Sequence, residues 1–207
     1  EALNEQFPGA RFYSFAEEHV QKQESFDFRG TEPPVPAIIT EYGVKFRADP
    51  AGAHKTGFFA DQRENREWLS RLCEGKRVLD LCCNTGGFGV YAAARGASEV
   101  VGIDIDAAVI EIAKENAYLN AAQIGGRKPR FVQADIFPWL RDAGNNGERF
   151  DVVILDPAKM TRDREQVIAA LKKYLDMNKL ALGVVKPGGL FATFSCTGLV
   201  SEDQFLD

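Results

Sequence analysis

The sequence has few of the residues that build metal clusters and disulfide frameworks. Its 207 residues include only two histidines and four cysteines, and none of the cysteines forms a CxxC pair. Zinc sites usually combine closely spaced cysteines and histidines, so we expect no metal. A disulfide framework is equally unexpected at this size, and reduced thiols predict a cytoplasmic protein.

Long apolar runs and an excess of basic residues are also lacking. No window approaches the ~20 apolar residues that a membrane span needs, and the first residues do not resemble a secretion signal. The net charge of −5 argues against a broad nucleic-acid surface, although a local basic groove stays open. The chain begins without methionine and stops just inside an expected helix, so we expect a piece of a longer protein.

The first 50 residues differ in pattern from the rest of the chain. Ser14–Glu17 has the spacing of a capping box, which predicts a short helix. The proline-rich segment 31–36 predicts a linker or an edge element, and Tyr42-Gly43 predicts the turn of a small hairpin. We therefore expect an accessory segment with a short helix and a hairpin over residues 1–50, followed by the main domain over 51–207.

Strands and helices alternate over the main domain. A helix is expected to begin at Asp61, with Glu64 as its reciprocal cap. The predicted strands span 77–81, 99–103, 130–133, 151–155 and 190–194. The clearest helix spans about 163–182, and its predicted apolar stripe is Val167, Ile168, Leu171, Tyr174, Leu175 and Leu182. Apolar strands separated by helices predict an α/β, Rossmann-like, mostly parallel sheet with helices on both faces, preceded by a small α+β appendage.

The first strand of the main domain leads into a glycine-rich turn. The segment Asp80-Leu-Cys-Cys-Asn-Thr-Gly-Gly-Phe88 has the order strand, turn, helix, which typically binds a cofactor at the carboxyl edge of a sheet. Gly86 and Gly87 would let a ligand approach the backbone closely. Cys82 and Asn84 stand where the dinucleotide fingerprint requires glycines, which disfavours a pyrophosphate and hence a dehydrogenase.

Acidic residues follow three successive strands, at Asp80, Asp104 and Asp135. A carboxylate at Asp104 can accept both hydroxyls of a ribose, and one at Asp135 can accept a hydrogen bond from the adenine amine. This row of acids favours S-adenosylmethionine, a cationic nucleoside without phosphate; the alternative is a set of acidic helix caps. The expected cofactor-binding residues are Asp80, Cys82, Asn84, Thr85, Gly86, Gly87, Phe88, Asp104, Ile105, Asp135, Ile136 and Asp156.

Several segments resemble known methyltransferase motifs. Those similar to class I methyltransferases, within residues 76–196, are Val78–Phe88, Asp104, Glu115–Asn120 and Asp135. Those similar to the bacterial large-subunit ribosomal RNA 5-methylcytosine methyltransferases and their relatives, within about 38–205, are His54–Arg66, Asp156–Lys159 and Ser195–Thr197. The resemblance implies S-adenosylmethionine as cofactor and RNA, specifically ribosomal RNA, as substrate.

The resemblance also implies a covalent mechanism. Cys196 would add as a thiolate to C6 of cytosine, so that C5 can attack the methyl group. Lys159 or Lys55 would supply the positive charge that a thiolate needs, and Asp156 would bond the base edge or manage protons. Because the target base must leave its stack, looped or single-stranded RNA is the expected substrate.

Two positions depart from this subfamily. Ala158 replaces the second proline of its Asp-Pro-Pro segment, and Met160 replaces the aromatic residue that follows. Three functions therefore stay open: methylation of ribosomal RNA at cytosine C5, methylation of another RNA base or a small molecule with Cys196 as a buried structural residue, and S-adenosylmethionine binding without catalysis. The oligomeric state cannot be predicted from the sequence.

Overall fold

The structure is a computed structural model that describes residues 5–10, 16, 18–30, 35–49 and 58–206. Contacts divide the chain into two compact units, Glu1–Ile38 with Arg47–Phe59 and Ile39–Phe46 with Ala60–Asp207. The domain boundary predicted near residue 50 stays a prediction.

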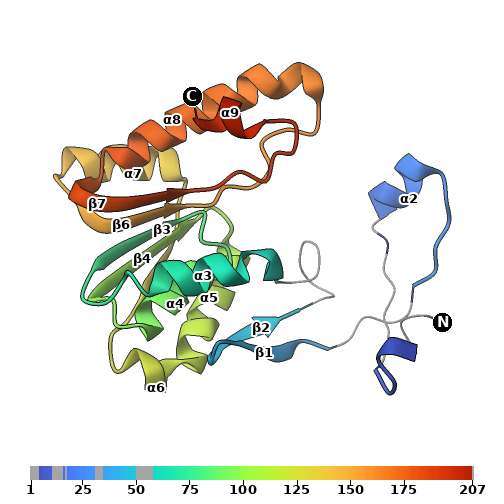
Figure 1. Cartoon of the computed structure of the whole chain (residues 1–207), viewed down its shortest axis with the longest axis horizontal. Helices are drawn as coiled ribbons and strands as arrows, with labels where there is room; N and C mark the ends of the chain where they lie inside the picture. The colour runs from blue at the N-terminus through green and yellow to red at the C-terminus, as the bar shows by residue number, and fades with distance from the viewer. Residues whose placement is uncertain (1–4, 11–15, 17, 31–34, 50–57, 207) are drawn as a thin grey trace. The chain divides into compact units, whose positions relative to one another are not determined.

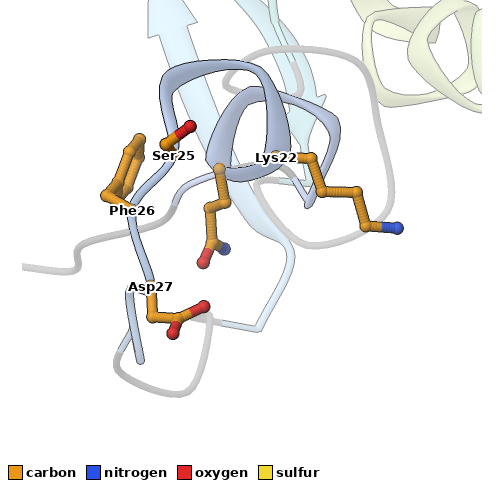
Figure 2. A pocket seen from close by; sticks show the side chains of 5 residues that line it. Lys22, Ser25, Phe26 and Asp27 are labelled. Carbon is orange, nitrogen blue, oxygen red and sulfur yellow. The ribbon is translucent and has the colours of Figure 1, made fainter.

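The smaller unit contains helix α2 (Glu18–Glu24). Figure 2 shows a pocket of about 390 Å³ beside this helix, lined by Gln21, Lys22, Ser25, Phe26 and Asp27. Ser14 and Glu17, the predicted capping pair, lie outside the described residues, as does most of the predicted linker 31–36.

A five-stranded parallel sheet forms the centre of the larger unit. In spatial order its strands are β5 (Arg130–Gln133), β4 (Glu99–Asp104), β3 (Arg77–Leu81), β6 (Phe150–Leu155) and β7 (Val185–Thr193). All neighbouring strands are parallel, so their carboxyl ends lie along one edge. The chain leaves β3 toward β4 and β5 and then returns to β6 on the other side. The carboxyl ends of β3 and β6 therefore form a switch point, where open α/β sheets bind ligands.

Helices cover both faces of this sheet (Figure 1). The helices of the larger unit are α3 (Arg63–Ser70), α4 (Gly87–Ala94), α5 (Ala107–Leu119), α6 (Ala121–Ile124), α7 (Ile136–Asn145), α8 (Val167–Leu182) and α9 (Glu202–Leu206). Alternate residues of β3 face opposite layers: Leu79 packs with Leu140 and Tyr174 from α7 and α8, whereas Val78 packs with Leu69 and Phe88 from α3 and α4. The predicted Rossmann-like α/β fold is confirmed.

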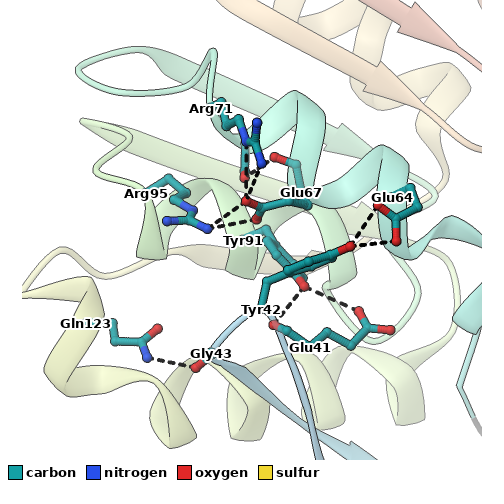
Figure 3. A network of polar contacts seen from close by, with 10 residues as sticks. Glu41, Tyr42, Gly43, Glu64, Glu67, Arg71, Tyr91, Arg95 and Gln123 are labelled. Carbon is teal, nitrogen blue, oxygen red and sulfur yellow. Dashed lines mark hydrogen bonds and ion pairs between the residues drawn. The ribbon is translucent and has the colours of Figure 1, made fainter.

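The predicted hairpin is present as β1 (Ala37–Glu41) and β2 (Val44–Ala48). Tyr42 and Gly43, at φ 45° and 85°, form its turn, and left-handed residues at both central positions suit a tight hairpin. Residues Ile39–Phe46 of the hairpin belong to the larger unit. There the Phe46 ring stacks on the Tyr91 ring, with 5.7 Å between the ring centroids. Gln123 of α6 donates a hydrogen bond to the Gly43 carbonyl at 2.8 Å (Figure 3).

The predicted start of the helix at Asp61 is wrong. Asp61 lies in a 3-10 turn (Ala60–Gln62), and α3 begins at Arg63 without a side-chain cap. Glu64 does not act as a reciprocal cap. Its carboxylate instead accepts the Tyr42 hydroxyl at 2.6 and 2.8 Å (Figure 3), so a tertiary contact replaces the local one.

The predicted apolar stripe of α8 is also partly wrong. Ile168, Leu175 and Leu182 are 82%, 49% and 53% exposed. The side chains that α8 buries are Ala170, Tyr174, Met177 and Ala181. Two alanines in this set let the helix approach the sheet closely, and Ile168, Leu175 and Leu182 lie on the outer face.

Candidate functional site

The turn after β3 alternates left-handed residues. Cys82, Asn84 and Gly86 have φ of 58°, 47° and 78°. A non-glycine residue costs about 1–3 kcal/mol in such a conformation, so the surroundings must hold it. One such support is the Asn84 amide, which donates to Asp104 Oδ2 at 2.9 Å at the end of β4. The turn is thereby fixed to the neighbouring strand.

Two glycines of this turn lie close to side chains of neighbouring elements. A Cβ atom on Gly86 would lie 3.0 Å from the Cβ of Ala113 and from the Phe131 ring. A Cβ atom on Gly87 would lie 3.1 Å from Cδ of Arg66. The absence of these Cβ atoms lets α3, α5 and β5 pack closely around the turn. From the sequence, the two glycines are expected only to leave space for a ligand.

Asp80 is a carboxylate buried at the end of β3, with 1% of its surface exposed. Its Oδ2 accepts the Gly89 amide of α4 at 2.8 Å, whereas its Oδ1 has no hydrogen-bond partner in the described part of the chain. Burial, together with the charges of Asp156 and Asp104, raises the pKa of Asp80 to about 7. A buried carboxylate with a vacant acceptor is costly unless a donor or a cation approaches it.

Four acidic residues gather around Cys82. Burial first, and then the negative charges of Asp104, Asp80, Asp156 and Asp135, raise the pKa of the Cys82 thiol to about 12. The strand-end acids predicted to converge therefore share one neighbourhood. At neutral pH the Cys82 thiol therefore stays protonated, which makes it a poor nucleophile.

The acids differ in the backbone groups that they accept. Asp104 is half-buried and accepts the amides of Asn84 and Asp106. Asp135 is exposed and accepts the Phe137 amide at 2.9 Å as the N-cap of α7. The helix-cap alternative thus describes Asp135, although one of its two oxygens accepts no hydrogen bond from a described residue. Ile105, which follows Asp104, is 68% exposed.

Other predicted cofactor-binding residues lie deeper. The Phe88 and Ile136 side chains are 7% exposed and belong to the two core clusters, so they would contact a ligand only through their backbone. Thr85 is buried, and its amide donates a hydrogen bond to Asn84 Oδ1 at 2.8 Å.

The two loops of the predicted reaction centre lie side by side. Cys196 is exposed, and its thiol sulfur lies 3.9 Å from the carbonyl oxygen of Pro157, next to Asp156. The Asp156 amide in turn donates to the Leu81 carbonyl at 3.4 Å, which joins this loop to the cofactor turn. Exposure of Cys196 does not fit the interpretation of this cysteine as a small buried residue at a strand end, and its catalytic role stays a prediction. Lys159 is exposed on the same loop.

The remaining cysteines do not offer a reactive thiol. Burial raises the pKa of the Cys73 thiol to about 12 and also raises the pKa of the Cys83 thiol strongly. Both thiols therefore stay protonated at neutral pH. Lys55, predicted as a possible source of charge, lies outside the described residues. Within the described part of the chain, no cluster of three His, Cys, Asp or Glu side chains could hold a metal ion. No described helix combines the length and the apolar character needed to cross a membrane.

A sequence profile of the S-adenosylmethionine-dependent methyltransferases matches residues 15–206. The chain belongs to this methyltransferase family. It is 40% identical to Ribosomal RNA large subunit methyltransferase I of Tolumonas auensis and to that of Vibrio parahaemolyticus, over 210 residues each. These alignments cover 99% of the chain and 52% and 53% of the relatives. The chain thus spans about half the length of the curated relatives it matches.

Solved structures show the methyltransferase fold as well. The crystal structure of SMU.776 complexed with S-adenosylhomocysteine has a TM-score of 0.72 at 24% identity and covers 86% of this chain and 47% of that chain. An S-adenosylmethionine-dependent methyltransferase from Agrobacterium tumefaciens has a TM-score of 0.67 at 24% identity, over 82% of this chain and 57% of that chain. At this identity the likeness concerns the fold alone.

The residues at the switch point fit the cofactor of the family. S-adenosylmethionine carries a sulfonium and an ammonium group beside a ribose, so it suits an acidic cluster. The unpartnered Oδ1 of Asp80 offers a buried acceptor for such a ligand, and Asp104 and Asp156 add negative charge. The missing glycines at Cys82 and Asn84 are consistent with a ligand that has no pyrophosphate.

Proposed function

We propose that the chain forms the cofactor-binding and reaction centre of an RNA methyltransferase that methylates C5 of a cytosine in large-subunit ribosomal RNA. The names of the 40%-identical relatives support this substrate class. The observation that carries the chemistry is the exposed thiol of Cys196, 3.9 Å from the Pro157 carbonyl and beside the acidic switch point.

In this proposal the acids bind the cofactor from three sides. Asp104 accepts the ribose hydroxyls, and Asp135 with Ile105 contacts the adenine. Asp80 and Asp156 face the positive charges of the methionine part. Both lie close enough to Cys82 for their negative charges to raise the pKa of its thiol. The cofactor, when bound, supplies an electrophilic methyl group.

The chain's own residues supply the activation of the base. The thiolate of Cys196 adds to C6 of cytosine, and the electron pair of the C5–C6 double bond moves toward C5. C5 would then take the methyl group that the bound cofactor supplies, and the electrons of the S–CH₃ bond would stay with the sulfur of the cofactor product. The C5 proton passes to Asp156, the C5–C6 double bond forms again, and the thiolate leaves. Lys159, exposed on the same loop as Asp156, is the residue that this proposal assigns as the source of positive charge near Cys196.

A fluorinated RNA tests the covalent step. In RNA that contains 5-fluorocytosine, C5 carries no proton to lose, so the adduct to Cys196 persists. With S-adenosylmethionine present, the wild-type protein should give a denaturation-resistant RNA adduct, and Cys196→Ala should give none. Calorimetric titration with S-adenosylhomocysteine should show unchanged binding by Cys196→Ala, which controls for folding.

Two results would redirect the proposal. Methylation of C5 that survives Cys196→Ala would show that the covalent route is wrong. A methylated product on another RNA base or on a small molecule would favour the second function left open by Ala158 and Met160.

A further inference from the structure

A chain of hydroxyl groups connects α8 with both loops of the reaction centre. The Tyr174 hydroxyl lies 2.8 Å from Thr197 Oγ1 and accepts a hydrogen bond from Ser195 Oγ at 3.0 Å. Thr197 Oγ1 also accepts the Met160 amide at 3.0 Å. Tyr174 and Thr197 are each 2% exposed, and the Tyr174 ring packs edge-on against Phe205 at 5.3 Å. The network is therefore held in the interior of the larger unit.

This network fixes both neighbours of Cys196 but leaves its thiol accessible. Ser195 and Thr197 both bond to Tyr174, and the Thr197 amide donates to Ser195 Oγ at 3.3 Å. The Cys196 side chain itself is exposed, and its sulfur lies 3.9 Å from the Pro157 carbonyl oxygen. The residues on both sides of Cys196 are thus bonded to Tyr174 of α8, while the cysteine stays exposed.

The same threonine hydroxyl also holds the second loop. Met160 follows Asp156 by four residues, and its amide bonds to Thr197 Oγ1. One buried atom is therefore the junction between the loop that carries Asp156 and Lys159 and the loop that carries Cys196.

The surroundings give a reason to assign this junction more than a packing role. Tyr174 belongs to an otherwise apolar cluster that contains Leu155 and Met177, where a phenylalanine ring would pack as well. Hydroxyl groups in such a place contribute little net free energy of folding compared with apolar groups of the same shape. What they add is a fixed direction and length, because each bond allows only a narrow range of geometry.

We propose that Tyr174 and Thr197 are positioning residues that set the distance between the Cys196 thiol and a base held at Asp156. This inference rests on the function proposed above. A misplacement of about 1 Å can lower the rate of a reaction by about 100-fold. Tyr174→Phe and Thr197→Val, which remove hydroxyls and keep shape, should therefore lower kcat by about 10- to 100-fold.

The experiment measures kcat and KM for ribosomal RNA with these variants made in the full chain, and the dissociation constant of S-adenosylhomocysteine by calorimetry. KM and the dissociation constant should stay within about twofold of wild type, because neither residue contacts the acidic cluster. Thr197→Ser retains the hydroxyl and should recover kcat to within about threefold of wild type.

Thr193→Val provides a matched control. Thr193 Oγ1 donates to Asn178 Oδ1 at 2.8 Å and so joins β7 to α8 in the same way, but this bond includes no residue of either loop. This variant should keep the wild-type kcat. A kcat for Tyr174→Phe and Thr197→Val equal to that of wild type would overturn the proposal. So would an equal loss of kcat in Thr193→Val, since that would indicate general loosening of the helix.

The rate of adduct formation on 5-fluorocytosine RNA separates this inference from the proposed function. If wild type forms the adduct and the two variants form it equally fast, the positioning role is wrong and the proposed function stands. If wild type forms no adduct, the proposed function fails and the positioning role fails with it. Slower adduct formation by both variants, restored in Thr197→Ser, supports both.

Discussion

Arg66 and Glu41 form an ion pair that is almost fully removed from solvent. Their side chains are 3% and 7% exposed. Arg66 donates through Nε at 3.2 Å and through Nη2 at 2.8 and 3.0 Å to the two carboxylate oxygens. The pair joins the hairpin to α3, and the Arg66 side chain also packs at Gly87, where α4 begins. The Tyr91 hydroxyl adds a bond to the Glu41 carbonyl at 2.8 Å.

Replacing Arg66 with methionine removes the charge and keeps a long unbranched side chain. Glu41 is then buried without its cation, and breaking a buried pair in this way costs about 3–5 kcal/mol. For a domain of this size each kcal/mol lowers Tm by about 2–4 °C, so Tm should fall by about 6–20 °C. Replacing both partners, with Glu41→Leu and Arg66→Met together, should recover most of the loss, because no unpaired charge is left.

Urea unfolding followed by circular dichroism measures these free energies. Arg71→Met is the matched control: Arg71 lies on the same helix, its side chain is 67% exposed, and it bonds to Glu67 at 3.2 Å (Figure 3). Because Arg71 is exposed and the buried Glu67 keeps a second cation, Arg95 at 2.8 Å, loss of Arg71 should cost less than about 1 kcal/mol. Equal losses for Arg66→Met and Arg71→Met would refute the reasoning that burial sets the energy of the pair.

Three further predictions concern the cofactor turn. Gly86→Ala should lower the free energy of unfolding by at least about 1–3 kcal/mol, measured in urea, because φ is 78° and the Phe131 ring lies 3.0 Å from the new Cβ; an unchanged midpoint would contradict this. Asp104→Asn should weaken S-adenosylhomocysteine binding by about tenfold in calorimetry, whereas Asp106→Asn, which alters only the α5 cap, should not; equal effects would exclude the ribose contact. S-adenosylmethionine affinity should rise as pH increases through about 7, where Asp80 loses its proton, and that of the uncharged-sulfur product should rise less; identical pH profiles would argue against a sulfonium contact.

The parallel sheet could be predicted because its central strands, β3, β4 and β6, are largely buried. Strands β3 and β5 have the predicted bounds, 77–81 and 130–133. Strand β7 begins at Val185, five residues before its predicted start. The predicted start is late because Pro187, Gly188 and Gly189 have the composition of a turn. In the structure Gly189 fits a close approach, since its Cβ would lie 2.9 Å from the Asp151 carbonyl oxygen.

The site could be predicted only where strand order determines it. Acidic residues at the carboxyl ends of parallel strands lie along one edge of the sheet. The proximity of Asp80 and Asp104 could therefore be predicted without knowing their side-chain contacts. Arg66 and Tyr174 could not be found in this way. Arg66 has the spacing of an ordinary helix residue, and its ion-pair partner Glu41 is 25 residues away in the sequence. Tyr174 lies in an apolar stripe, and its hydrogen-bond partner Thr197 is 23 residues away.

The burial of Asp80 weakens the fold near neutral pH, and this cost itself points to a cationic ligand. Burial raises the pKa of Asp80 from 3.8 to about 7, so between these values the folded chain holds a proton that the unfolded chain has lost. The stability that this proton contributes is complete below pH 3.8 and is lost as pH rises toward 7. A bound cation offsets the buried charge and restores what deprotonation removes. An apolar residue would avoid the penalty, but it could not couple the stability of the cofactor turn to the charge of the ligand.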